Sequence, residues 1–138
     1  MSETNYRVAL VSASPKVEQE WAVSAFLAKY GESRLTRDSL TVTTIPVRHA
    51  LMHHETDSAF ATLQEADAIV LIFPLYFFCM PAMLTRFLQD FTAKEPKATN
   101  NCAVYALVNC GFPEPEINLE AMRVVEQFAL QTGRVFGG

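Results

Sequence analysis

The stretch AIVLIFPLYFFCMPAML, residues 68–84, decides the fold of this chain. Its first six residues form an unbroken apolar run rich in β-branched side chains, without alternation of apolar and polar positions. A strand that is apolar on both sides is covered on both faces, as the central strands of parallel α/β sheets are. Pro74 ends this strand because proline cannot donate a hydrogen bond to the sheet. Pro81 marks the start of a predicted helix, AMLTRFLQDF.

The same stretch is almost long enough to be a membrane-spanning helix. However, two prolines interrupt it, and the helix that follows carries Arg86 and Asp90. The chain also has no second apolar span. These features favour a buried strand followed by a surface helix, and no membrane partner is expected.

Length and composition indicate a single globular domain covering residues 1–138. Half of the residues are apolar and 19% are charged, which excludes a disordered chain. The formal net charge is −4 and no basic stripe is present, so no nucleic-acid partner is expected. The N-terminus lacks an apolar signal core, and Cys79, Cys102 and Cys110 lack metal-type spacing. Both features predict a cytoplasmic protein with reduced thiols.

Apolar runs of strand length alternate with helical patterns along the whole chain. Strands are predicted at residues 7–12, 39–47, 68–73, 103–108 and 134–136, and helices at residues 17–30, 57–65, 82–91 and 118–132. Strict alternation implies parallel strands joined by right-handed crossovers. The predicted fold class is therefore α/β, with a three-layer, doubly wound, parallel five-stranded sheet. The strand at 39–47 is more polar, which places it nearer an edge.

The last helix of such a fold is missing, since no helix is predicted after the fifth strand. We therefore expect part of the sheet face, around Val8, Leu10 and Val104 or their neighbours, to lack cover from this chain. An uncovered sheet face exceeds the apolar surface that soluble monomers tolerate. Either a longer natural chain or a second subunit is expected to cover it.

Three loops are expected to meet at the carboxyl edge of the sheet, where open α/β sheets bind ligands. The first, SASPKV at 12–17, combines two hydroxyls, backbone N–H groups and the positive end of a helix dipole, with Lys16 nearby. This combination is a generic anion site, although Ser and Pro also begin helices for structural reasons alone.

The second and third loops, at 74–80 and 109–116, offer aromatic faces. A flat heteroaromatic ring fits between such faces, whereas the alternative is that Phe77 and Phe78 simply fill the edge of the core. The dinucleotide fingerprint GxGxxG and the Walker loop GxxxxGK[ST] are both absent. A phosphoacceptor domain is also excluded, because no Asp ends the third strand.

These loops resemble those of the flavodoxin-like NAD(P)H-dependent FMN reductases, a family that also contains quinone and azo-dye reductases. The matching pieces are SASPK, DAIVLIFPLYFFCMPAMLTRFLQDF and VNCGFPEPEIN. The resemblance implies an FMN-dependent oxidoreductase that transfers electrons from NAD(P)H to a small acceptor such as a quinone or free flavin. It also implies a homodimer. Because the flavin carries the chemistry, no catalytic side chain is expected.

The resemblance also implies a set of FMN-binding residues. The phosphate would be held by Ser12, Ser14 and Lys16. The ring would be bordered on one side by Pro74, Leu75, Tyr76 and Phe77, and closed on the other by Asn109, Cys110, Gly111 and Phe112.

Two departures from the family pattern leave an alternative open. Glu18 and Glu20 lie in the first turn of the first helix and would repel a phosphate. Phe78-Cys79-Met80 stands where relatives often carry a glycine. The alternative is a flavodoxin-like module with weak or lost flavin binding, acting in protein interaction or electron transfer.

The histidines of the segment HALMHH, residues 49–54, are not expected to bind a metal. His49 and His53 would share a helix face, but a metal site needs a third ligand, and nothing in the pattern assigns Glu55 or Asp57 to that role. A solvated connection is the favoured interpretation. Cys79 and Cys110 have no histidine in their loops to activate them, so both are interpreted as free thiols without a catalytic role.

Overall fold

The computed structural model of the protein describes residues 6–13, 40–75, 79–94, 102–109 and 115–138. Along the chain, the elements are β1 (Tyr6–Ser12), β2 (Leu40–Pro46), α2 (Val47–Met52), α3 (Thr56–Glu65), β3 (Ala68–Pro74), α4 (Ala82–Ala93), β4 (Ala103–Asn109), the 3₁₀ helix η2 (Pro115–Asn118), α5 (Leu119–Gln131) and β5 (Val135–Phe136). The helix predicted at 17–30 lies outside the described residues.

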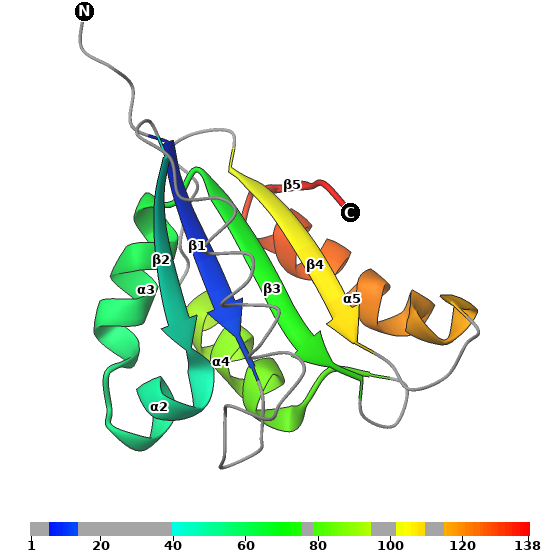
Figure 1. Ribbon diagram of the computed structural model, residues 1–138, viewed down its shortest axis with the longest axis horizontal. Coiled ribbons are helices and arrows are strands. Elements are labelled where there is room, and N and C mark those ends of the chain that lie inside the picture. Colours follow the sequence, from blue (N-terminus) through cyan, green and yellow to red (C-terminus); the bar gives the residue numbers. More distant parts are fainter. Residues whose placement is uncertain (1–5, 14–39, 76–78, 95–101, 110–114) are drawn as a thin grey trace, which may run out of the picture.

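The five strands form one sheet in the order β2-β1-β3-β4-β5, and every neighbouring pair is parallel (Figure 1). The predicted α/β fold class with a parallel five-stranded sheet is therefore confirmed. β2 is an edge strand, as its more polar sequence indicates. β5 is short, but the Gly137 amide extends its pairing by donating to the Val104 carbonyl at 2.8 Å.

The main core lies between the sheet and the helices α2, α3, α4 and α5, which cover the same face (Figure 1). β3 places Ile69, Leu71 and Phe73 in this core, and all three are fully buried. Its alternate residues Ala68 and Ile72 are buried on the opposite face. β3 is thus apolar on both sides because both of its faces are covered, as its sequence predicts.

The expectation about the uncovered sheet face is wrong for the three residues named, and the exposed residues of that face include Tyr105, the neighbour of Val104. Val8 and Leu10 are buried in a second cluster with Ala68 and Ile72, and Val104 points to the helix side and belongs to the main core. The exposed apolar residues of this face lie further along the sheet, on β4. Tyr105 and Leu107 are 41% and 44% exposed. The register explains their position, because Leu10, Val70 and Tyr105 stand side by side on adjacent strands.

The segment around His49 is also different from the prediction. It forms the helix α2, which begins directly after β2 and is not among the predicted helices. Val47 and Ala50 are buried and hold this helix on the core, while His53 and His54 are exposed. A helix of only six residues presents too few apolar positions for its periodicity to be detected in the sequence.

None of the helices in the described ranges is long and apolar enough to cross a membrane.

Candidate functional site

The carboxyl edge of the sheet contains a topological switch point between β1 and β3. The chain leaves β1 toward β2 on one side, and from β3 onward it proceeds to β4 and β5 on the other. Connections that leave two adjacent strands in opposite directions open a crevice between them, where α/β proteins bind their ligands. The two strand ends are joined directly, because the Ala13 amide donates to the Ile72 carbonyl at 2.9 Å.

Four of the predicted site residues are brought together at this edge. Ser12 ends β1 and is half-buried, Pro74 ends β3, and Leu75 follows it. Asn109 ends β4 in register with Pro74. The remaining predicted site residues lie outside the described ranges: Ser14, Lys16, Tyr76, Phe77, Cys110, Gly111 and Phe112.

The described residues on either side of segment 76–78 pack against the core. Leu75 before it and Cys79 after it are partly buried and pack against the main core cluster. Met80 is buried, and Pro81 begins the turn into α4, where its carbonyl accepts from the Leu84 amide at 3.0 Å. The residues that flank the predicted ring site are therefore held in fixed positions by packing.

The groups at this edge fit a flavin better than a metal ion. Ser12 contributes a hydroxyl, Leu75 an apolar surface and the strand ends backbone polar groups. Asn118, at the start of α5, has a buried Oδ1 without a hydrogen-bond partner among the described residues. Across the described ranges there is no group of three His, Cys, Asp or Glu residues that could hold a metal.

The histidines of α2 interact with one another and with one carboxylate. The rings of His49 and His53 have their centroids 4.2 Å apart, and His49 Nε2 lies 3.4 Å from Glu55 Oε2. Asp57, the other ligand considered in the sequence, pairs with Lys94 Nζ at 3.0 Å instead. This segment is thus a solvated surface of stacked rings and ion pairs.

Two residues with a shifted pKa, Cys102 and Tyr6, lie at the opposite, amino edge of the sheet. Burial raises the pKa of the Cys102 thiol above its ordinary value, and the neighbouring Arg134 offsets only part of this effect. Burial also raises the pKa of Tyr6, at the start of β1. Arg134 itself is buried. It donates from Nη1 to the Thr132 carbonyl at 3.0 Å and lies 5.3 Å from the centroid of the Phe91 ring.

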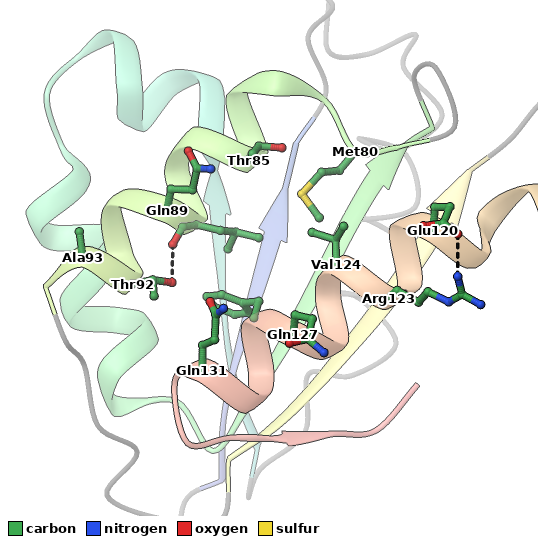
Figure 2. A pocket seen from close by; sticks show the side chains of 12 residues that line it. Met80, Thr85, Gln89, Thr92, Ala93, Glu120, Arg123, Val124, Gln127 and Gln131 are labelled. Atoms are coloured by element: carbon green, nitrogen blue, oxygen red, sulfur yellow. Dashed lines mark hydrogen bonds and ion pairs between the residues drawn. The ribbon is translucent and has the colours of Figure 1, made fainter.

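A groove of about 560 Å³ runs between α4 and α5, on the helix side of the molecule, and we call it the α4–α5 groove (Figure 2). Its lining is contributed by α4, by α5 and by Met80, whose side chain extends toward Val124 (Figure 2). No sequence pattern predicts this groove. The only signal in the sequence is a row of uncharged polar residues, Thr85, Gln89 and Thr92, on a helix whose charged residues are Arg86 and Asp90.

The sequence profile of a protein family described as "Flavodoxin-like fold" matches residues 7–101, which include β1 to α4 and the β1/β3 switch point. The chain belongs to this family. The match covers two of the three segments on which the resemblance was recognised, so the predicted family is confirmed. A comparison with curated proteins finds no match.

Solved structures with a flavodoxin-like fold are similar to this protein over nearly its whole length. An NADH:FMN oxidoreductase in its apo form is 22% identical, with a TM-score of 0.73 over 95% of this chain and 72% of that chain. A P. pentosaceus NADPH-quinone reductase is 20% identical, with a TM-score of 0.68 over 96% and 82%. An FMN-dependent NADH-azoreductase from Bacillus anthracis in complex with FMN is 11% identical, with a TM-score of 0.64 over 95% and 85%. At these identities the likeness shows the fold.

Proposed function

We propose that this flavodoxin-like protein is an FMN-dependent oxidoreductase that transfers electrons from NAD(P)H to a small acceptor such as a quinone or free flavin. The observation that carries the proposal is the switch point between β1 and β3, with Ser12 on one side and Pro74-Leu75 on the other. In this strand order the β1/β3 switch point is where FMN binds. Further support comes from the similar structures, which are an NADH:FMN oxidoreductase, an NADPH-quinone reductase and an FMN-dependent NADH-azoreductase.

The proposed binding residues follow the three loops at the carboxyl edge. The phosphate would be held by Ser12, Ser14 and Lys16, at the positive end of the helix predicted after β1. The ring would lie between two groups of residues, Pro74, Leu75, Tyr76 and Phe77 on one side and Asn109, Cys110, Gly111 and Phe112 on the other.

The protein's task in this proposal is to bind and orient. Leu75 is partly buried against the core, so its remaining surface can contact a ring without moving. Because Cys79 is anchored in the same way, the loop between them keeps its ends fixed when a ligand binds. Bound FMN would supply the electron-transfer chemistry, and no side chain is proposed as an acid or a base.

We also propose that residues 1–138 form a single domain that acts as a homodimer in the cytoplasm. Residues from Tyr6 to Phe136 contribute strands to one sheet, which supports a single domain. Cys79 and Cys102 are free thiols, which a reducing compartment maintains.

A second candidate is a flavodoxin-like module with weak or lost flavin binding that acts in protein interaction or electron transfer. Glu18 and Glu20 favour it, since two carboxylates near the phosphate site oppose a phosphate dianion. The α4–α5 groove favours it as well, because it offers a contact surface that is independent of the flavin site.

Titration with FMN and with riboflavin distinguishes the two candidates. The purified protein is mixed with each compound, and the visible flavin absorbance and fluorescence are followed. The proposed function predicts tighter binding of FMN than of riboflavin, followed by FMN-dependent oxidation of NADH or NADPH when a quinone is added. Binding of neither compound would leave the second candidate as the correct one.

The double variant Glu18→Ser/Glu20→Asn tests the proposed phosphate site. Removing two negative charges should tighten FMN binding by about 30-fold, since each close like-charge contact costs on the order of 1 kcal/mol near a surface. Riboflavin, which lacks the phosphate, should bind as before. An equal gain for both compounds would contradict the electrostatic argument.

A further inference from the structure

The α4–α5 groove has the dimensions of a small-molecule site. Its volume of about 560 Å³ falls within the range of roughly 300–1,000 Å³ that is usual for such sites. α4 has 12 residues and α5 has 13, so at about 1.5 Å rise per residue each helix is roughly 20 Å long. Two helices side by side, each about 10 Å wide, give a protein partner a footprint of roughly 400 Å². Since a stable protein complex buries about 800 Å² per partner, the dimensions favour a small molecule.

The floor of the groove is apolar. Met80, Leu88 and Phe128 form it, and all three side chains are buried. Val124 lies beside them, with the Met80 side chain extending toward it, and is 39% exposed (Figure 2). A ligand that covers these side chains gains free energy in proportion to the apolar surface that it removes from water. The main body of the ligand is therefore expected to be apolar.

The charged side chains of the groove neutralise each other. Arg123 Nη1 lies 2.7 Å from Glu120 Oε1 at one end of the groove, and this pair is drawn in Figure 2. All the other described residues that line the groove are uncharged. A charged ligand would have to break or share this ion pair, whereas a neutral ligand leaves it intact. The charge distribution therefore favours a neutral molecule.

Three glutamine amides supply the unused hydrogen-bond donors of the groove. Gln89 on α4 and Gln127 and Gln131 on α5 line it, and within the described part of the chain their side chains form no hydrogen bond. The Thr92 hydroxyl, in contrast, already donates to the Leu88 carbonyl at 2.8 Å. Each glutamine amide carries two N–H donors, which oxygen atoms of a ligand can accept.

We propose that the α4–α5 groove binds a neutral, largely apolar small molecule that carries oxygen acceptors such as carbonyl or ether groups. Its apolar body would lie on Met80, Leu88 and Phe128, and its oxygens would accept hydrogen bonds from the glutamine amides. Among the described lining residues, none is proposed to bind FMN. Because a groove leaves one side of its ligand in water, we expect a dissociation constant of about 1–100 μM.

Nile red is a suitable probe, because it is neutral, carries a carbonyl and an ether oxygen, and fluoresces more strongly in apolar surroundings. Titration of the dye with the wild-type chain should give a dissociation constant in the expected range, and added FMN should not displace the dye. In ¹H–¹⁵N spectra of the labelled protein, the dye should shift the side-chain amide signals of Gln127 and Gln131. The amide signals of Gln64 on α3, which does not line the groove, should stay unchanged.

Two variants of the groove, each with a matched control, locate the bound dye. Val124→Trp places an indole beside Met80 and should weaken dye binding by at least about tenfold, because it occupies the space of the ligand. Gln127→Glu keeps the shape of the side chain but exchanges the amide donors for a charge. It should weaken binding by about tenfold and serves if Val124→Trp folds poorly. Leu130 is 60% exposed on the same helix outside the groove, so Leu130→Trp and Leu130→Glu should bind the dye as the wild type does.

Three results would overturn the proposal. The first is a wild type that does not bind the dye, and the second is binding that Val124→Trp and Gln127→Glu leave unchanged. The third is displacement of the dye by FMN, since the dye would then occupy the proposed flavin site. None of these measurements depends on the oxidation of NADH or NADPH, so the proposed oxidoreductase function is tested separately.

Discussion

Phe91 at the end of α4 offers a direct measure of how this small core is stabilised. Its ring is buried, with centroid distances of 5.5 Å to Phe60 and 6.1 Å to Phe128, and the guanidinium of Arg134 lies 5.3 Å from its centroid. Phe91→Leu keeps an apolar side chain of similar size and removes these three interactions. Phe87, which is equally buried, has one such interaction within the described part of the chain, with Phe60 at 5.2 Å.

The difference between the two substitutions follows from these contacts. An aromatic pair contributes about 0.5–1.5 kcal/mol beyond its buried area, and a desolvated cation–π contact contributes about 2 kcal/mol. Phe91→Leu removes one more aromatic pair and one more cation–π contact than Phe87→Leu does. It should therefore lower the free energy of unfolding by roughly 3 kcal/mol more than Phe87→Leu.

Urea denaturation of both variants, followed by circular dichroism, measures this difference. The single variant Arg134→Met and the double variant Phe91→Leu/Arg134→Met complete a double-mutant cycle, which isolates the cation–π contact. Its coupling energy should be about 2 kcal/mol. Equal losses for Phe91→Leu and Phe87→Leu, together with a coupling energy near zero, would refute the reasoning and show that shape alone accounts for the packing.

Three other predictions concern the site and the two ends of the sheet. Ser12→Ala should weaken FMN binding by about tenfold or more, because a hydrogen bond to the phosphate is lost. Isothermal titration measures this affinity, and riboflavin, whose affinity should not change, is the control. Burial raises the pKa of the Cys102 thiol above its ordinary 9.0, so the neutral thiol stabilises the fold fully below that pH and this stabilisation is lost as the pH rises further. In thermal melts at alkaline pH, the melting temperature of Cys102→Ala should therefore fall less than that of the wild type. A Cβ at Gly137 would collide with the Tyr105 ring, so Gly137→Ala should cost about 1 kcal/mol, and no such cost should remain in a Tyr105→Ala background.

Local sequence patterns determine most of the secondary structure of this protein. The apolar run at 68–73 predicts β3 because a strand buried on both faces has no polar side. Pro81 and Gly133 predict the start of α4 and the end of α5, since proline begins helices and Gly133 adopts a φ of 71°. The short α2 was missed because its two buried residues, Val47 and Ala50, form no detectable period.

The location of the candidate site also follows from the sequence. Parallel strands end at the same edge of a sheet, so the order of strands and loops already places Ser12, Pro74 and Asn109 together. The identity of the exposed sheet residues does not follow in the same way. It depends on register across neighbouring strands, which places Tyr105 beside Val70 and moves the exposed part of that face to β4.

The α4–α5 groove is decided by tertiary structure alone. Each helix shows an ordinary amphipathic pattern, and neither Thr92 nor Gln127 is unusual in its own segment. The groove exists because packing on the sheet brings the two helices side by side, so that residues about 40 positions apart in the chain line one surface (Figure 2). Periodicity describes one helix at a time, and the groove forms only when the two helices are placed together.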